Sequence, residues 1–191
     1  MSATHETDIP LTFNGEVLRD TGVLVYKCYQ CGKCSAGCPM AVEMEYPPSL
    51  ALRMLQTEDA THRNKLLSSL TIWLCVNCEM CLTRCPMEID IPHLMDYLRQ
   101  KSMAQKMTNP KAKNIISFHK AFLDSIEHTG RLYELGLIAN YKLRSGSFMQ
   151  DVGVAPKMFA KGKLSLIPEF IKGRKGMLQM FKSTNNGGAQ L

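Results

Sequence analysis

Residues 28–39 read CYQCGKCSAGCP, and residues 75–86 read CVNCEMCLTRCP. Each stretch spaces its cysteines as C-x2-C-x2-C-x3-C and places a proline directly after the last one. All eight cysteines of the chain fall in these two stretches. One motif used twice therefore organises the chain, and its chemistry decides what the remaining residues have to support.

The spacing is that of bacterial two-cluster ferredoxins, in which the fourth cysteine of each run binds the other cluster. A [4Fe–4S] cube needs four thiolates directed at one small object, and one tight loop offers three of them. The proline disfavours the α conformation of the fourth cysteine, which turns away from its own loop. We therefore predict two [4Fe–4S] clusters, one bound by Cys28, Cys31, Cys34 and Cys85, and the other by Cys75, Cys78, Cys81 and Cys38.

Three other uses of cysteine compete with this interpretation. Structural zinc also uses paired C-x2-C units, but it leaves the third cysteine and the Cys-Pro step of each run unexplained. A disulfide framework requires a secreted chain, and residues 1–10 show no apolar signal segment. Dithiol redox chemistry requires one C-x-x-C unit near a βαβ pattern. The pattern favours iron–sulfur clusters over all three.

Length and composition indicate an ordinary globular protein. The chain has 191 residues, of which 45% are hydrophobic and 21% charged, and this fits one domain or one small domain with an appendage. No segment approaches the roughly 18 consecutive apolar residues that cross a bilayer, so we expect no membrane span. Thiolates that bind iron suit a reducing compartment. The predicted location is cytoplasmic, with any membrane attachment made through partners.

The formal net charge of +6 is concentrated near the C-terminus. Between residues 155 and 182, Glu169 is outnumbered by Lys157, Lys161, Lys163, Lys172, Arg174, Lys175 and Lys182. Without a nucleic-acid motif or interleaved aromatic residues, we expect no nucleic-acid partner, and interpret the segment as a solvated face or a docking surface for an acidic partner. Lys27 and Lys33 flank the first cysteines, where they either raise the cluster potential, meet an acidic partner or are simply exposed.

The two cysteine runs belong to an internal repeat with an offset of 47 residues. Pro48 starts an apolar helical pattern after the first run, and Asp90, a favoured N-cap residue, starts another after the second. Each half is thus a cluster loop followed by a helix. We predict a mainly α protein with an α-helical ferredoxin-like domain, in which helices replace the strands of small ferredoxins. Residues 23–26 form either a short strand or an apolar segment that packs against a cluster.

Beyond Pro110 the chain has no cysteine, but apolar residues recur at helical spacing over 115–126 and 132–143. Gly130 and Gly146 follow as helix ends. We predict a flexible N-terminus at 1–14, the two-cluster domain at 15–108, a helical arm at 109–182 and a disordered tail at 183–191. We interpret the arm as a docking arm whose apolar faces meet another subunit; the alternative is that it packs back on its own domain. No catalytic residue and no site for flavin, nucleotide or organic substrate is visible.

The stretches YKCYQCGKCSAGCP at 26–39 and CVNCEMCLTRCP at 75–86 resemble the small iron–sulfur subunit of the heterodisulfide reductases of methanogens, over roughly residues 15–145. The resemblance implies a place in methanogenesis, within a flavin-based electron-bifurcation complex. In that family, a flavin-bearing subunit feeds this small relay subunit, which passes single electrons through two [4Fe–4S] clusters. A third, cysteine-rich subunit then reduces the mixed disulfide of coenzyme M and coenzyme B. The eight cysteines are the functional residues that carry over.

We therefore expect a non-catalytic, electron-transfer subunit of a cytoplasmic oxidoreductase complex acting on a disulfide. Its partners would be the flavin-bearing and the cysteine-rich, catalytic subunits of heterodisulfide reductase, with a hydrogenase or formate dehydrogenase as the indirect electron donor. The chain has no adjacent Cys-Cys pair of the kind found in the catalytic module, which argues against its reducing the disulfide itself. Two alternatives remain: a free-standing ferredoxin-like carrier, and the iron–sulfur subunit of another anaerobic dehydrogenase.

Overall fold

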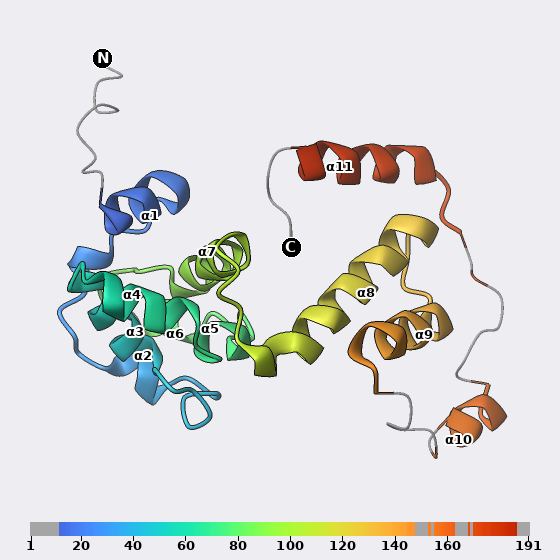
Figure 1. The fold of residues 1–191 in the computed structure, drawn as a ribbon, viewed down its shortest axis with the longest axis horizontal. Coiled ribbons are helices and arrows are strands. Elements are labelled where there is room, and N and C mark those ends of the chain that lie inside the picture. The colour runs from blue at the N-terminus through green and yellow to red at the C-terminus, as the bar shows by residue number, and fades with distance from the viewer. Residues whose placement is uncertain (1–11, 148–152, 154, 163–167, 169, 187–191) are drawn as a thin grey trace. The chain divides into compact units, whose positions relative to one another are not determined.

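The computed structural model describes residues 12–147, 153, 155–162, 168 and 170–186 (Figure 1). Within these ranges every regular element is helical and none is a strand, which confirms the predicted mainly α class. The chain divides into two compact units, Met1–Asn109 and Pro110–Leu191. Most of the predicted flexible N-terminus lies outside the described residues, although the first helix already begins at Phe13.

The first unit holds both cysteine runs. Its elements are α1 (Phe13–Thr21), the 3₁₀ turn η1 (Val25–Lys27), α2 (Lys33–Ala36), α3 (Pro48–Gln56), α4 (Ala60–Leu67), α5 (Thr71–Leu74), α6 (Met80–Arg84) and α7 (Ile91–Ala104). Side-chain caps start several of these helices, because the first backbone N–H groups of a helix have no partner within it. Asp90 caps α7 as predicted, accepting from the N–H of His93 at 3.0 Å, and Asp59 caps α4 in the same way.

Helix α7 runs through the core of this unit, and α1, α4, α5 and α6 all pack against it. The fully buried side chains include Leu52, Leu66, Leu67, Ile72, Leu94 and Leu98. Each such side chain contributes about 1.5–3 kcal/mol by leaving water. Buried polar groups add directional links, since Ser102 Oγ donates to the carbonyl of Leu67 at 2.7 Å and Asn14 Nδ2 to that of Leu55 at 2.8 Å. The result is a fixed frame on which the cysteine loops are mounted.

Two local expectations differ from the structure. The strand alternative at residues 23–26 is wrong: Val23 and Val25 are buried, and the backbone turns into η1 immediately before Cys28. The apolar positions at helical spacing after Asp90 include Met107, which predicts a helix reaching that residue, but α7 stops at Ala104 and Lys106 adopts a left-handed φ of 56°. Both corrections concern places where the chain must change direction at the edge of the core.

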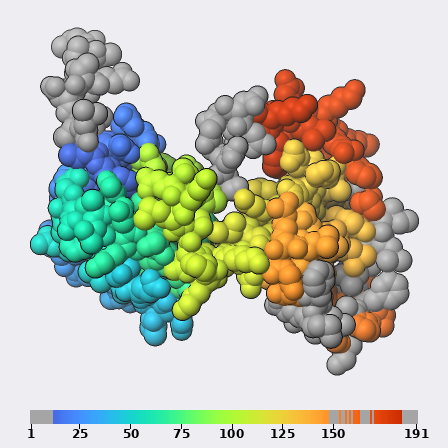
Figure 2. All heavy atoms as spheres, in the orientation of Figure 1, coloured from blue at the N-terminus to red at the C-terminus, as the bar shows by residue number. Residues whose placement is uncertain are grey.

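The second unit contains η2 (Pro110–Ala112), α8 (Lys113–Thr129), α9 (Glu134–Ser145), α10 (Ala155–Ala160) and α11 (Arg174–Asn186). Helices α9 and α11 both pack against α8 (Figure 2). Gly130 and Gly146 end α8 and α9 as predicted, with left-handed φ values of 85° and 77°. Helix α11 extends into the tail predicted to be disordered from residue 183; residues 187–191 lie outside the described part.

The sequence predicts no membrane-spanning segment in either unit. In the described part of the chain, no helix combines the length and the apolar character that crossing a bilayer requires.

Candidate metal centre

The two cysteine loops share one backbone conformation. Gln30 and Asn77, each two residues after the first cysteine of its run, have φ values of 62° and 50°. Gly32 and Glu79, the next pair related by the repeat, have φ values of 74° and 59°. A left-handed conformation is uncommon for residues other than glycine. Its recurrence at equivalent positions shows that both loops curl in the same way although most of their residues differ.

The burial of the cysteines repeats as well. The first and fourth cysteines of each run are half-buried, the second is exposed and the third is buried. The third cysteine lies in each case on a short helix that follows the loop, Cys34 on α2 and Cys81 on α6. These two helices pack against each other. Their packing brings the first run next to the second, although 47 residues separate them in sequence.

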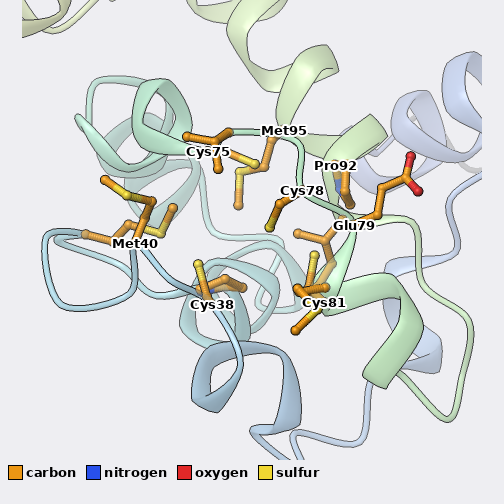
Figure 3. Close-up of a pocket in the computed structure, with 13 residues that line it drawn as sticks. Cys38, Met40, Cys75, Cys78, Glu79, Cys81, Pro92 and Met95 are labelled. Carbon is orange, nitrogen blue, oxygen red and sulfur yellow. The ribbon is translucent and has the colours of Figure 1, made fainter.

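One pocket collects the four thiols predicted to bind the second cluster. It is lined by Cys38 of the first run and by Cys75, Cys78 and Cys81 of the second. Figure 3 shows the thiols of Cys38, Cys78 and Cys81 pointing into this space and the carboxylate of Glu79 pointing away from it. The empty space between these residues, including the part open to solvent, is about 380 Å³.

The rest of the pocket wall is mostly apolar. It is formed by Met40, Met44, Pro48, Val76, Glu79, Met80, Ile91, Pro92 and Met95. Burial, and after it the charge of the neighbouring Cys75 thiolate, raises the pKa of the Cys81 thiol to about 11. The free thiol is therefore protonated at neutral pH, and binding of iron has to release that proton.

The predicted ligands of the first cluster also lie together. The pKa of the exposed Tyr29 phenol is raised, first by partial desolvation and then by a hydrogen bond to Cys31 and by the charges of Cys31, Cys85 and Cys28. Cys85 therefore lies close enough to Tyr29 of the first loop for its charge to act on the phenol. The backbone N–H of Ile89 donates to Cys85 Sγ at 3.5 Å. Burial raises the pKa of the fourth member, Cys34.

The donor set fits iron–sulfur clusters. All eight cysteines are free thiols, so every one is available as a thiolate ligand. In the part of the chain that the structure describes, no three His, Cys, Asp or Glu side chains are placed to hold one metal ion.

Comparison with protein families identifies the cysteine-bearing segment. Residues 24–89 match the family model of the 4Fe-4S dicluster domain. The dicluster domain contains all eight cysteines, which confirms the predicted cofactors: the chain binds two [4Fe–4S] clusters and has an iron–sulfur, electron-carrying role. No curated protein matches the chain.

Two side-chain networks behind the loops of the dicluster domain were not predicted. Gln56 Nε2 on α3 donates to the carbonyls of Val25 and Cys28, at 3.2 and 2.7 Å. Arg99 on α7 donates to the carbonyls of Ile72 and Cys75 and pairs with Asp96. The sequence carries no motif for either network, because the partners are backbone atoms that only the fold brings near.

Proposed function

We propose that the chain is the electron-relay subunit of a cytoplasmic CoB–CoM heterodisulfide reductase complex. It would pass single electrons from the flavin-bearing subunit to the disulfide-reducing one, with no catalytic residue of its own. The observation that carries the proposal is the pair of like-folded cysteine loops in one dicluster domain. The resemblance of residues 26–39 and 75–86 to the small iron–sulfur subunit of these reductases supplies the identity of the complex.

Within this proposal the cysteines divide into two crossed sets. Cys28, Cys31, Cys34 and Cys85 hold one cluster, and Cys75, Cys78, Cys81 and Cys38 hold the other. When bound, each cluster accepts and releases one electron at a time. The protein keeps the two sites adjacent through the packing of α2 on α6, and shields the second site with methionines. Proximity of the two sites is what a relay requires.

The second unit supports the idea of a docking partner. Phe118 on α8 and Ile138 and Leu143 on α9 are exposed, Leu143 by 73% of its surface. Lys161, Lys172, Lys175 and Lys182 are exposed as well, whereas Lys163 and Glu169 of the predicted basic segment lie outside the described residues. A unit that exposes both large apolar side chains and positive charge suits a protein partner that offers apolar and acidic groups.

Native, anaerobic purification of the full chain tests the proposal. We expect two further polypeptides, one flavin-bearing and one cysteine-rich, to accompany it in equal amounts. In the assembled complex, Cys85→Ser should abolish disulfide reduction while the flavin of the partner is still reduced by its donor. If the chain elutes alone with its full iron content, it is a mobile carrier and the proposal fails.

A matched pair of variants tests the arm separately. Leu143→Ser should weaken assembly of the complex, because it removes an exposed apolar contact without touching a cysteine loop. Leu143→Ile keeps the apolar surface and should assemble normally. Iron content should equal that of the unaltered chain in both. Equal assembly by the two variants would exclude this part of α9 from the docking surface.

A further inference from the structure

The two cysteine loops present opposite ends of an amide to their first cysteine. Gln30 Nε2 lies 3.3 Å from Cys28 Sγ. At the equivalent position of the second loop, Asn77 Oδ1 lies 3.4 Å from Cys75 Sγ. The side chain therefore places a donor at the sulfur in the first loop and an acceptor in the second, where the backbone N–H of Asn77 is the donor to Cys75.

Gln56 fixes the orientation of Gln30. The amide nitrogen of Gln56 donates to the backbone carbonyls of Val25 and Cys28, which can only accept. Gln56 Oε1 is consequently turned towards Gln30, whose Nε2 donates to it at 3.2 Å. The second proton of the Gln30 amide is then directed at Cys28 Sγ. A flipped Gln30 would bring two amide oxygens together.

Asp96 holds the Asn77 amide in the opposite orientation, with its oxygen towards the cysteine. Arg99 Nη1 pairs with Asp96 Oδ1 at 2.7 Å, and Asp96 Oδ2 accepts from Asn77 Nδ2 at 2.9 Å. A carboxylate can only accept, so the amide nitrogen of Asn77 is held at Asp96. The oxygen is left beside Cys75. The contact suits the free thiol, which donates, but it offers no hydrogen bond to a thiolate.

The formal charges of the loops act in the same direction. Residues 27–38 include Lys27 and Lys33 and no acidic residue, whereas residues 74–85 include Glu79 and Arg84, which cancel. Arg99 also donates to the Cys75 carbonyl, but its charge is balanced by Asp96. Hydrogen bonds to the ligand sulfurs and local net charge are among the factors that set the potential of an iron–sulfur cluster. A donor and positive charge favour the added electron, and an acceptor disfavours it.

We propose that the opposed amides make the two sites of the dicluster domain unequal. Gln30 raises the reduction potential at the site of Cys28, and Asn77, held by Asp96, lowers the potential at the site of Cys75. One electron supplied by a low-potential donor therefore rests at the first site. Its passage from the second site to the first oxidises the second by one electron and reduces the first by one, without a proton. The inference rests on the proposed crossed ligand sets and relay role, but not on the identity of the partners.

Two variants test the inference from opposite sides, with the full chain loaded anaerobically with both clusters. The two midpoint potentials are measured by a redox titration followed by electron paramagnetic resonance. Gln30→Met removes the donor while keeping a side chain of similar length, and should lower only the higher potential. Asp96→Asn allows the Asn77 amide to turn its nitrogen towards Cys75 Sγ, and should raise only the lower potential. Each should change the one-electron equilibrium between the sites roughly tenfold, or about 59 mV.

Matched controls separate the amides from general effects. Gln100→Met makes the same chemical change at an exposed position of α7 and should move neither potential. Glu79→Gln removes one negative charge from the second loop without releasing Asn77, so its effect should be smaller than that of Asp96→Asn. Bound iron is measured for every variant. If Asp96→Asn binds less iron than the unaltered chain, the test of the inference rests on Gln30→Met alone.

The inference is overturned if Gln30→Met leaves the higher potential unchanged, or if it lowers the other one instead. It is also overturned if Asp96→Asn lowers a potential or shifts both equally. These measurements use the isolated chain, so the absence of reductase partners in a purification would refute the proposed complex without altering them.

Discussion

Replacing Arg99 with Met should release the second cysteine loop while leaving the first intact. The Arg99 side chain is 10% exposed and reaches three acceptors from α7. Its Nε donates to the carbonyl of Ile72 at 2.6 Å, its Nη2 to the carbonyl of Cys75, and its Nη1 to Asp96 at 2.7 Å. The carbonyls of Ile72 and Cys75 lie at the two ends of the short segment that leads into the second cysteine loop. Met replaces the apolar stem of Arg99 but supplies no donor, so both carbonyls lose their partner.

The expected cost follows from these contacts. A hydrogen bond to a charged group contributes about 1.5–3 kcal/mol, which gives about 3–6 kcal/mol for the two carbonyls. The ion pair adds about 1 kcal/mol or less, because the Asp96 side chain is 41% exposed. Water reaches the half-buried Cys75 and recovers part of the loss. We therefore expect a net cost of about 3 kcal/mol, which corresponds to an open-loop population raised ~100-fold.

Iron release to a chelator under anaerobic conditions measures this opening. For Arg99→Met, half of the iron should leave ~100-fold faster than from the unaltered chain, since the open-loop population scales with the free-energy cost. The other half should leave at the original rate. Arg99→Lys should fall between the two, because an ammonium group cannot serve three acceptors as the planar guanidinium does. Lys101→Met is the matched control on the same helix; Lys101 pairs with Glu16 at 3.0 Å and should not affect either phase.

Two results would refute this reasoning. Release of all the iron in one accelerated phase would mean that Arg99 stabilises the whole unit and not one loop. Release at the rate of the unaltered chain would mean that the two carbonyls find other partners at little cost.

Three further changes have effects that the structure predicts. Leu98→Ala, at a fully buried position of α7, should cost about 2–5 kcal/mol in unfolding free energy, measured by anaerobic thermal denaturation; a loss below this range would mean that the core collapses around the cavity. Asp90→Ala removes the N-cap of α7 and should cost about 1 kcal/mol in the same experiment, whereas Asp90→Asn should be nearly neutral. Gly130→Ala adds a Cβ that would clash with the side chain of Ile171, which precedes α11, and should speed hydrogen exchange in α11. Gly146→Ala is the control, because Gly146 has a similar φ but its added Cβ would have no atom within 4 Å, so only the end of α9 should exchange faster. Equal hydrogen exchange of α11 in the two variants would contradict the predicted clash.

The helices show how far local signals extend. Caps and terminal glycines lie within a few residues of the positions they affect, so Asp90, Gly130 and Gly146 were identified as helix ends from the sequence. Residues 23–26 were ambiguous because a short apolar run suits a strand and an apolar segment packed against a cluster equally well. The structure resolves the ambiguity through burial, since Val23 and Val25 face the core while the chain turns into the first loop.

The sequence by itself determined the cofactor. Thiolate spacing is a covalent property of the chain, so two runs of C-x2-C-x2-C-x3-C-P were enough to predict two [4Fe–4S] clusters. The mainly helical class was predicted from the apolar patterns that begin at Pro48 and Asp90. The repeat also predicted that Cys38 and Cys85 would each belong with the other run. The pocket that collects Cys38 with Cys75, Cys78 and Cys81 is consistent with that prediction.

Only the tertiary structure decided how the amides of the two loops are oriented. In sequence, Gln30 and Asn77 are equivalent amides at equivalent positions. Which end of each amide faces its cysteine depends on Gln56 of α3 and Asp96 of α7, residues 26 and 19 positions further along the chain. Hydrogen-bond direction is set by the partners that packing supplies, and spacing within a motif carries no information about them.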